Sequence, residues 1–395
     1  MTRDPIGAGG PQQFTRDRLT FLAYGMAIAF GYTVAALGPA MPLLRDELDI
    51  SRTVGGLHFT ALAAGSVLAG SVVSRIVRVW GRHRVFWSGG AGVATGAVLI
   101  GTGWHPAITM FGCLIAGAFG SAVLITVQAS LSDHHAAHRP VALTEANMST
   151  SIGTVIPTMV IGGSVLLGIG WRPAFFVPLA IWTALFALLR FEVFPPSKPT
   201  LPLQSGRVLP TPYWFFWVAF IPAVGAEWCV GAWGADYLVT VAGTAEGTAS
   251  FLMSAFFGAM VLGRFLGGRV ARRISPLQLL LGTTTIGLAG TVLLRASSTL
   301  PGVVSGLFLA GLGISMLFPM LLALAIDTAS DRSDMAAARI AIAAGGSVIV
   351  APLTLGAVAD QVGIRSAFSL VPALLVFVVL FAALGRRSSR IAEIG

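Results

Sequence analysis

The sequence has few charged residues and almost no cysteine. Only 10% of its 395 residues are Asp, Glu, Lys or Arg, whereas a soluble domain carries roughly 25%. Hydrophobic residues make up 55% of the chain, and the mean hydropathy is +0.83. A soluble fold could not cover so much apolar surface, so a soluble globular protein is excluded. The two cysteines, Cys113 and Cys229, both lie inside apolar runs, which excludes a disulfide framework and a cysteine-rich metal site.

The sequence also lacks the short motifs of common enzymes and of ATP-driven pumps. No phosphate-binding loop, nucleophile elbow or zinc-binding helix motif occurs. We therefore predict neither an enzyme nor a protein with a cofactor, and we expect any coupling ion to be a proton.

Long apolar runs dominate the chain instead. A transmembrane helix needs about 20 mostly apolar residues to cross about 30 Å of hydrocarbon. Lipid offers no hydrogen-bond partner to an open backbone edge, so these runs must be helical. We predict an all-α polytopic membrane protein with twelve transmembrane helices, near residues 19–44, 52–74, 84–104, 107–131, 143–169, 172–192, 212–242, 246–271, 277–297, 300–328, 334–360 and 364–385.

The predicted helices fall into two halves. A Pro-rich linker at 193–211 separates a six-helix half at 19–192 from a second one at 212–385. Residues 1–18 and 386–395 are predicted to be tails. The first is not expected to be a cleaved signal, because the apolar run after it is too long.

Basic residues are distributed unevenly over this topology. The formal net charge is +9 and the pI is about 10.9. With the N-terminus inside, 20 of the 25 Lys and Arg residues fall on the cytoplasmic side, and the outer side holds only Arg45, Arg52, Arg172, Arg295 and Arg365. This positive-inside pattern indicates orientation, with both tails cytoplasmic, and not a nucleic-acid partner. Arginine outnumbers lysine as in GC-rich bacterial genomes, so we expect the bacterial inner membrane.

The two halves resemble each other at an offset of 193 or 194 residues. The matching pairs of segments are 65–84 with 258–277, 116–133 with 310–327, and 171–180 with 364–373. Parallel six-helix repeats with a site between them at mid-depth are a transporter architecture.

The loop SRIVRVWGRHR at 74–84 resembles the signature G-x-x-x-D-R-x-G-R-[RK]-R of the major facilitator superfamily. Gly81, Arg82 and Arg84 match, whereas Ser74 replaces the first glycine and Arg78 replaces the aspartate. The resemblance extends over the whole chain. It implies the major facilitator fold of two six-helix repeats and a secondary transporter that works by alternating access. In the family, the aspartate helps to latch the cytoplasmic gate.

Within the superfamily, two segments are similar to the fucose-permease-type sugar symporters and their unassigned relatives. They read GAEWCVGAWGADYL at 225–238 and SAFFGAMVLGRFLGGR at 254–269. Drug/proton antiporters usually carry an arginine in the fourth helix and GPxxGG in the fifth. Here the fourth helix has no arginine, and the fifth reads IPTMVIGG at 156–163, so efflux of that type is the alternative function.

Glu227 lies near the centre of the seventh predicted helix. A carboxylate at mid-bilayer costs at least about 2.5 kcal/mol, so it normally faces a cavity or a polar partner. Gly231 and Gly234 share its helical face and leave room for a ligand. It could carry the coupled proton, bind the substrate, or make a purely structural hydrogen bond. We expect no Arg or Lys at mid-depth, which favours a neutral or cationic substrate over an anion.

Other polar and aromatic side chains of the apolar helices are candidates for the same site. They are Tyr24, Tyr32, Gln128, Asn147, Trp228 and Phe256. Aromatic faces suit sugars and apolar ligands, but helix packing and interhelical hydrogen bonds explain these residues about as well.

Charged residues near the cytoplasmic helix ends are candidates for a gate. The set comprises Arg78, Asp133, Glu145, Arg264, Arg272, Asp327 and Arg339. We hypothesise that Glu145 pairs across the halves with Arg264 or Arg272. Asp133 and its repeat partner Asp327 would hold arginines of the signature loops. The alternative is a set of solvated loop charges, which contribute little.

Three histidines in LSDHHAAHRP, His134, His135 and His138, have a spacing that could mimic a metal cluster. We interpret them as residues of a cytoplasmic loop and predict no metal site.

These observations predict a monomeric secondary transporter in the lipid bilayer. It would move a small polar solute, neutral or cationic and for example sugar-like, by proton-coupled alternating access. Multidrug efflux is the alternative, and a lipid flippase or a non-transporting receptor is less favoured.

Overall fold

Twelve helical spans make up the computed structural model, which describes residues 14–196, 209–329 and 332–394. Each is long and apolar enough to cross a membrane, so the predicted all-α fold with twelve transmembrane helices is confirmed. The first six spans are α1 (Arg18–Leu48), α2 (Arg52–Trp80), α3 (Arg82–Thr102), α4 (Pro106–His134), α5 (Arg139–Leu166), and η2 (Arg172–Phe176) with α6 (Val177–Leu189). The other six are α7 (Thr211–Ala242), α8 (Glu246–Leu252) with α9 (Ser254–Val270), α10 (Pro276–Ala296), α11 (Leu300–Ile314) with α12 (Leu317–Asp327), α13 (Ser333–Val362), and α14 (Ile364–Ala367) with α15 (Leu370–Ile394).

The helices begin and end where local chemistry satisfies the terminal backbone groups. Asp17 caps α1 by accepting a hydrogen bond from the Thr20 N–H at 2.9 Å, and Ser51 caps α2 by accepting one from the Val54 N–H at 3.2 Å. Gly243 follows α7 at a φ of 66°, a left-handed conformation that glycine adopts without strain.

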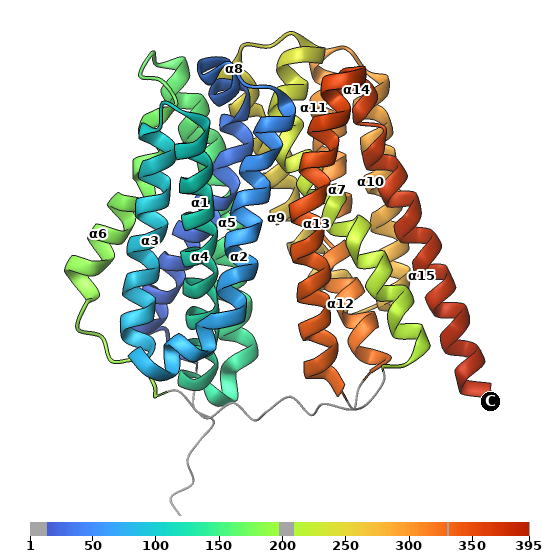
Figure 1. Ribbon diagram of the computed structural model, residues 1–395. Coiled ribbons are helices and arrows are strands. Elements are labelled where there is room, and N and C mark those ends of the chain that lie inside the picture. The colour runs from blue at the N-terminus through green and yellow to red at the C-terminus, as the bar shows by residue number, and fades with distance from the viewer. Residues whose placement is uncertain (1–13, 197–208, 330–331, 395) are drawn as a thin grey trace, which may run out of the picture.

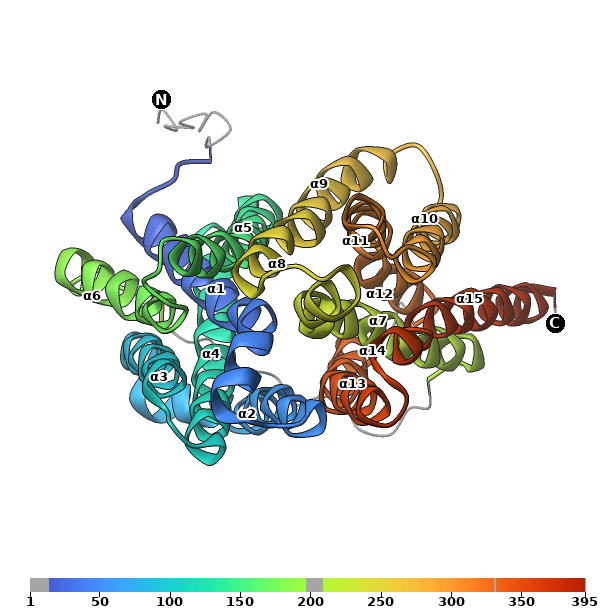
Figure 2. The same cartoon turned by 90° about the horizontal axis from the view of Figure 1, so that it is seen from above.

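The two halves stand side by side as separate helix bundles (Figure 1). We call the end of the molecule where α6 ends and α7 begins the linker end, and the end that carries α8 and α14 the far end. The ribbons of the two halves lie close together at the far end and diverge toward the linker end (Figure 1). Seen from above, α1, α2 and α5 of the first half face α7, α8, α9 and α13 of the second (Figure 2).

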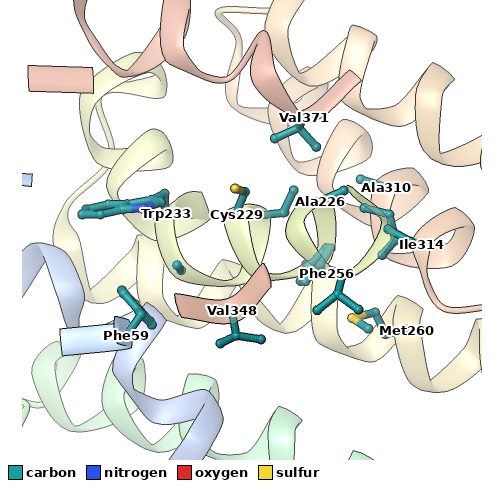
Figure 3. Packing of buried hydrophobic residues seen from close by; sticks show 14 of the residues in the cluster. Phe59, Ala226, Cys229, Trp233, Phe256, Met260, Ala310, Ile314, Val348 and Val371 are labelled. Atoms are coloured by element: carbon teal, nitrogen blue, oxygen red, sulfur yellow. The ribbon is translucent and has the colours of Figure 1, made fainter. Parts of the chain in front are cut away.

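Helix α7 is the centre of the largest hydrophobic core. Ala226, Cys229 and Trp233 are completely buried and lie along one stretch of this helix (Figure 3). Phe59 of α2 packs against Trp233 with ring centroids 6.1 Å apart, so the core continues from the second half into the first.

Two glycines let α1 and α7 cross at close range. A Cβ atom added to Gly38 would collide with the backbone carbonyl oxygen of Gly231. Beside this crossing, Ser250 of α8 donates a hydrogen bond to the Pro39 carbonyl at 2.7 Å. The halves are therefore in backbone-level contact on the far-end side of α1.

Candidate functional site

Glu227, Arg264 and Ser151 meet between the halves. Glu227 and Ser151 lie near the middle of α7 and α5, and Arg264 reaches them from α9. Arg264 of α9 places Nη2 3.5 Å from Oε1 of Glu227 on α7. Its Nη1 donates a hydrogen bond to the Ser151 hydroxyl of α5 at 2.8 Å. The side chains of Arg264 and Glu227 remain 36% and 26% exposed. They form an ion pair within the second half, and its arginine also contacts the first half.

The expectation that no basic group lies at mid-depth is wrong. Arg264 lies toward the linker end of α9, but its long side chain reaches the level of Glu227. Carboxylate and guanidinium therefore compensate each other, which lowers the cost of placing either charge within a membrane. The lack of a basic group at mid-depth was the reason for disfavouring an anionic substrate, and that reason no longer holds.

Two other polar or small residues lie near this group. Asn147 precedes Ser151 by one turn on the same face of α5, and its side chain is exposed. Gly231 follows Glu227 by one turn on α7, and a Cβ added there would meet nothing closer than Phe257, at 3.6 Å. An added methyl group would therefore fit next to Gly231 but not next to Gly234, which lies against Met253. Room for a ligand beside Glu227 stays a prediction.

The predicted aromatic candidates are mostly packing residues in this conformation. Tyr32 is fully buried and donates its hydroxyl to the Ala174 carbonyl at 2.8 Å. Phe256 is also fully buried and packs on Phe257, with ring centroids 5.2 Å apart. Trp228 is half-buried against the main core, and Gln128 of α4 is exposed. Trp228 and Gln128 stay candidates for ligand contact, whereas Tyr32 and Phe256 have no accessible surface to offer.

At the linker end, Glu145 is paired within its own half. Its carboxylate accepts hydrogen bonds from Arg16 Nε at 2.8 Å and from the Tyr24 hydroxyl at 3.0 Å. The hypothesised link from Glu145 to Arg264 is absent among the described contacts, because Arg264 is turned toward Glu227 and Ser151. Tyr24, a candidate for the central site, instead uses its hydroxyl to bond to Glu145 in this structure.

Asp133 was expected to hold an arginine of the signature loops, and the structure pairs it with Arg82 of the loop 74–84. The Arg82 Nη2 atom lies 2.7 Å from Asp133 Oδ2, with the two side chains 8% and 14% exposed. Both Arg78 and Arg272 are exposed. Arg82 is one of the positions that match the superfamily signature, so the loop keeps an anchor although the signature aspartate is replaced.

The C-terminal members of the predicted gate make no described link across the halves. Within residues 14–196, 209–329 and 332–394, no ion pair is recorded for Asp327, which is exposed at the end of α12. The Arg339 guanidinium lies 5.4 Å from the ring centre of Trp214 in the same half. Whether these residues act in a gate stays a prediction.

Changing Asp133 to Asn should lower the melting temperature of the purified protein, because Arg82 would lose the charge opposite it in a nearly buried pair. Breaking a fully buried pair costs about 3–5 kcal/mol, and partial exposure brings the expected cost to about 1–3 kcal/mol. The matched control is Asp327→Asn, the repeat counterpart, which should leave the melting temperature unchanged. Equal shifts in both variants would contradict the structural role of the Arg82–Asp133 pair.

A second ionic cluster, at the far end, holds the halves together. Asp236 of α7 is 3% exposed and accepts hydrogen bonds from Arg45 Nη1 at 2.8 Å and from Arg52 Nε at 2.6 Å. Asp360 of α13 accepts hydrogen bonds from the Arg52 and Thr53 N–H groups at 3.0 and 2.7 Å. We call Arg45, Arg52, Asp236 and Asp360 the far-end latch.

The far-end latch was missed in the sequence. Asp236 lies 191 residues from Arg45 and 184 from Arg52, so no local spacing joins them. The sequence held one indication of these contacts, because acidic residues are rare in the apolar helices and basic residues are rare on the predicted outer side. Asp236 is a second carboxylate in an apolar helix, and Arg45 and Arg52 are two of only five basic residues expected outside. Intramembrane acids normally need a partner.

The short segment before α1 is fixed to the linker end of α4 and α5. Arg16 bonds to Glu145, as described above, and the Asp17 Oδ2 atom lies 2.6 Å from His134 Nε2. Burial raises the pKa of Asp17, but hydrogen bonds from Thr20 and His134 outweigh it and place that pKa below its ordinary value. Asp17 is therefore a carboxylate at neutral pH.

Comparison of the sequence with known protein families shows to which family of membrane proteins the chain belongs. The sequence profile of the Major Facilitator Superfamily matches residues 23–244 and, separately, 216–393. The two matches together span nearly the whole chain. The first runs from α1 through α7 and the second from α7 into α15, so they overlap in α7. The chain belongs to the Major Facilitator Superfamily and is a multi-pass membrane transporter.

Individual relatives are more distant. An uncharacterized MFS-type transporter of Yersinia pestis is 23% identical over 377 residues, which are 93% of this chain and 94% of that protein. A glucose/galactose transporter of Brucella abortus is 28% identical over 169 residues, covering 42% of this chain and 40% of that protein. The nucleoside transporter NupG (D323A mutant) superimposes with a TM-score of 0.71 at 14% identity, over 94% of this chain and 98% of NupG. A bacterial homologue of the human lysosomal transporter Spinster, in an inward-facing and occupied conformation, gives 0.70 at 14% identity, over 94% and 96% of the two chains. At these identities the structural likeness shows the fold alone.

Proposed function

We propose that the protein is a proton-coupled secondary transporter that binds a small, neutral, polyhydroxylated solute between its halves. The observation that carries the proposal is the contact among Glu227, Arg264 and Ser151. An ion pair at the centre of a membrane bundle is costly, and such groups mark substrate or proton pathways. Here the pair lies at the interface that must rearrange when two repeats rock against each other.

The chemistry of the pair suits a proton switch. An ionised Glu227 neutralises Arg264, whereas a protonated Glu227 leaves Arg264 to find other hydrogen-bond acceptors. The Ser151 hydroxyl already accepts one such bond, and substrate hydroxyls could accept others. Proton binding and solute binding are thereby linked at the same guanidinium, which is what coupled transport requires.

The preference for a neutral solute follows from charge balance. With the pair intact, the site carries no net charge, and the carboxylate and guanidinium together offer acceptors and five N–H donors for hydroxyl groups. An anion would have to displace Glu227 from Arg264. The glucose/galactose and nucleoside transporters among the similar proteins are named for neutral, hydroxyl-rich solutes, which supports the same class.

The orientation is inferred from the arginines. The linker end carries most of the basic residues, so we propose that it is cytoplasmic. The five arginines of the other side all have partners. Arg45 and Arg52 belong to the far-end latch, Arg172 bonds to Glu47, Arg295 to Ser369, and Arg365 to two carbonyls of α10. If the linker end is cytoplasmic, the bonds that join the halves at the far end close the outer side of the protein. The structure then corresponds to an inward-facing state.

The test uses protein reconstituted in liposomes. Neutral sugars, nucleosides, organic anions and amines are first screened by thermal shift, and stabilising compounds are then added to vesicles of equal internal and external pH. We expect a neutral sugar or nucleoside to stabilise the protein and to raise the external pH as protons enter with it. Stabilisation by anions alone would contradict the solute class. Transport without any pH change would contradict proton coupling.

A further inference from the structure

Donor atoms of two histidines and one aspartate meet at the linker end, outside the central site. His134 ends α4 and His135 follows it, while Asp17 immediately precedes α1. One nitrogen of each ring and one Asp17 oxygen all lie within 4.8 Å of one another. The two histidines are neighbours in the chain, but Asp17 comes from more than a hundred residues away, so the fold itself assembles the group.

The neighbourhood holds these donors in place. Phe14 packs on the His135 ring with centroids 4.8 Å apart, and the rings of His134 and His135 are also 4.8 Å apart. His135 Nε2 is 2.7 Å from the Thr20 hydroxyl, in the first turn of α1. The adjacent Arg16–Glu145 pair fixes the same segment to α5. The three side chains are therefore gathered by contacts that do not require a bound ion.

The sequence alone predicted no metal site at these histidines, but the fold adds Asp17 to them. We propose that Asp17, His134 and His135 bind a divalent transition-metal ion, with Zn²⁺ as the best match. Two imidazoles and one carboxylate form a mixed nitrogen and oxygen set that Zn²⁺ accepts at about 2.0–2.2 Å, with water as a fourth ligand. Ion binding would replace the direct contact between Asp17 Oδ2 and His134 Nε2, which are 2.6 Å apart, and would draw the other donor atoms, all within 4.8 Å, around the ion. Hard cations such as Mg²⁺ and Ca²⁺ prefer oxygen ligands, so the two histidines disfavour them.

The site is open to solvent and has a structural consequence. The side chains of His134 and Asp17 are 35% and 43% exposed, so an ion could enter without unfolding. A bound ion would fasten the segment before α1 to the end of α4, within the first half. The proposal does not depend on the solute, the coupling ion or the central site.

The experiment measures Zn²⁺ binding to untagged, chelator-treated protein by calorimetry, because a polyhistidine tag would bind the ion itself. We expect one ion per chain at micromolar or tighter affinity and a rise in melting temperature with added Zn²⁺. Asp17→Asn and His134→Gln should each weaken binding by at least about tenfold and remove the rise. The matched control is His83→Gln, since His83 lies in the same half and contacts the Arg190 carbonyl instead.

The melting temperature without metal shows whether each variant folds. Addition of Co²⁺ supplies a further readout, because a tetrahedral site with nitrogen and oxygen ligands gives visible absorption bands that the site variants should lose. The proposal is overturned if the wild-type protein shows no saturable Zn²⁺ binding, or if His83→Gln loses binding as strongly as His134→Gln.

Discussion

Replacing Glu227 by glutamine should abolish proton-driven accumulation of the solute while counterflow exchange continues. Glutamine keeps the size and hydrogen-bonding ability of glutamate but cannot take up or release a proton. For one proton per solute, each unit of pH gradient stores about 1.4 kcal/mol and sustains up to about tenfold accumulation. The variant should reach only the external concentration, measured as radiolabelled solute in vesicles with an imposed pH gradient.

Two controls make this result specific. Glu246→Gln changes another carboxylate, at the start of α8, and should accumulate solute as the wild type does. Retained counterflow shows that the Glu227→Gln protein is folded and binds the solute. Full accumulation by the Glu227→Gln variant would refute the coupling role of Glu227. If the variant lost both counterflow and accumulation, the main role of Glu227 would be solute binding.

Replacing Asp236 by asparagine should open the far end of the protein. Asp236 is buried between two arginines of the other half, and the amide would leave those two positive charges without their shared counter-charge. Loss of one partner of a fully buried ion pair costs about 3–5 kcal/mol. Because Arg45 and Arg52 are 17% and 18% exposed, we expect about 1–3 kcal/mol, or roughly a 5- to 150-fold shift away from the state with a closed far end.

The measurement is the distance between spin labels at Trp104 and Ala245, exposed positions near the far end of the two halves. Both native cysteines are buried, so labelling at introduced cysteines meets little background. The distance distribution of Asp236→Asn should gain a longer component. The control is Asp49→Asn, an exposed change at the end of α1 that should leave the distribution unchanged. An unchanged distribution in Asp236→Asn would show that the far-end latch does not set the conformational balance.

The fold could be predicted from the sequence because its cause is local. Each span is an apolar run long enough to cross a bilayer, and most helix ends lie within a few residues of those runs. The ends of α2 and α15 are exceptions: α2 continues to Trp80 and α15 to Ile394, beyond the predicted ends at 74 and 385, so residues 386–394 extend a helix. Glu227 could also be singled out locally, as a carboxylate in an otherwise apolar helix. Its partner could not, because Arg264 lies some distance along α9 from the level of Glu227 and only its flexible side chain brings the charges together.

Other parts of the site depend on contacts that one-dimensional patterns do not contain. Tyr32 has the right type and depth for a ligand contact, but its hydroxyl faces η2 and bonds to Ala174. Asp236 and Arg52 lie on different halves and meet only after the halves associate. The rotation of each helix about its axis determines which of its side chains meet those of a neighbouring helix. A nearly uniform apolar sequence such as that of α7 carries little information about this rotation.

The placement of both central charges on one half has an electrical consequence. Glu227 and Arg264 belong to α7 and α9 of the same half, so they move as a unit when the halves rock, and the unit is neutral while Glu227 is ionised. A membrane potential does about 2.3 kcal/mol of work per elementary charge per 100 mV. The return of the empty carrier should therefore be insensitive to voltage, and the step that moves the protonated, loaded site should carry the voltage dependence of the cycle.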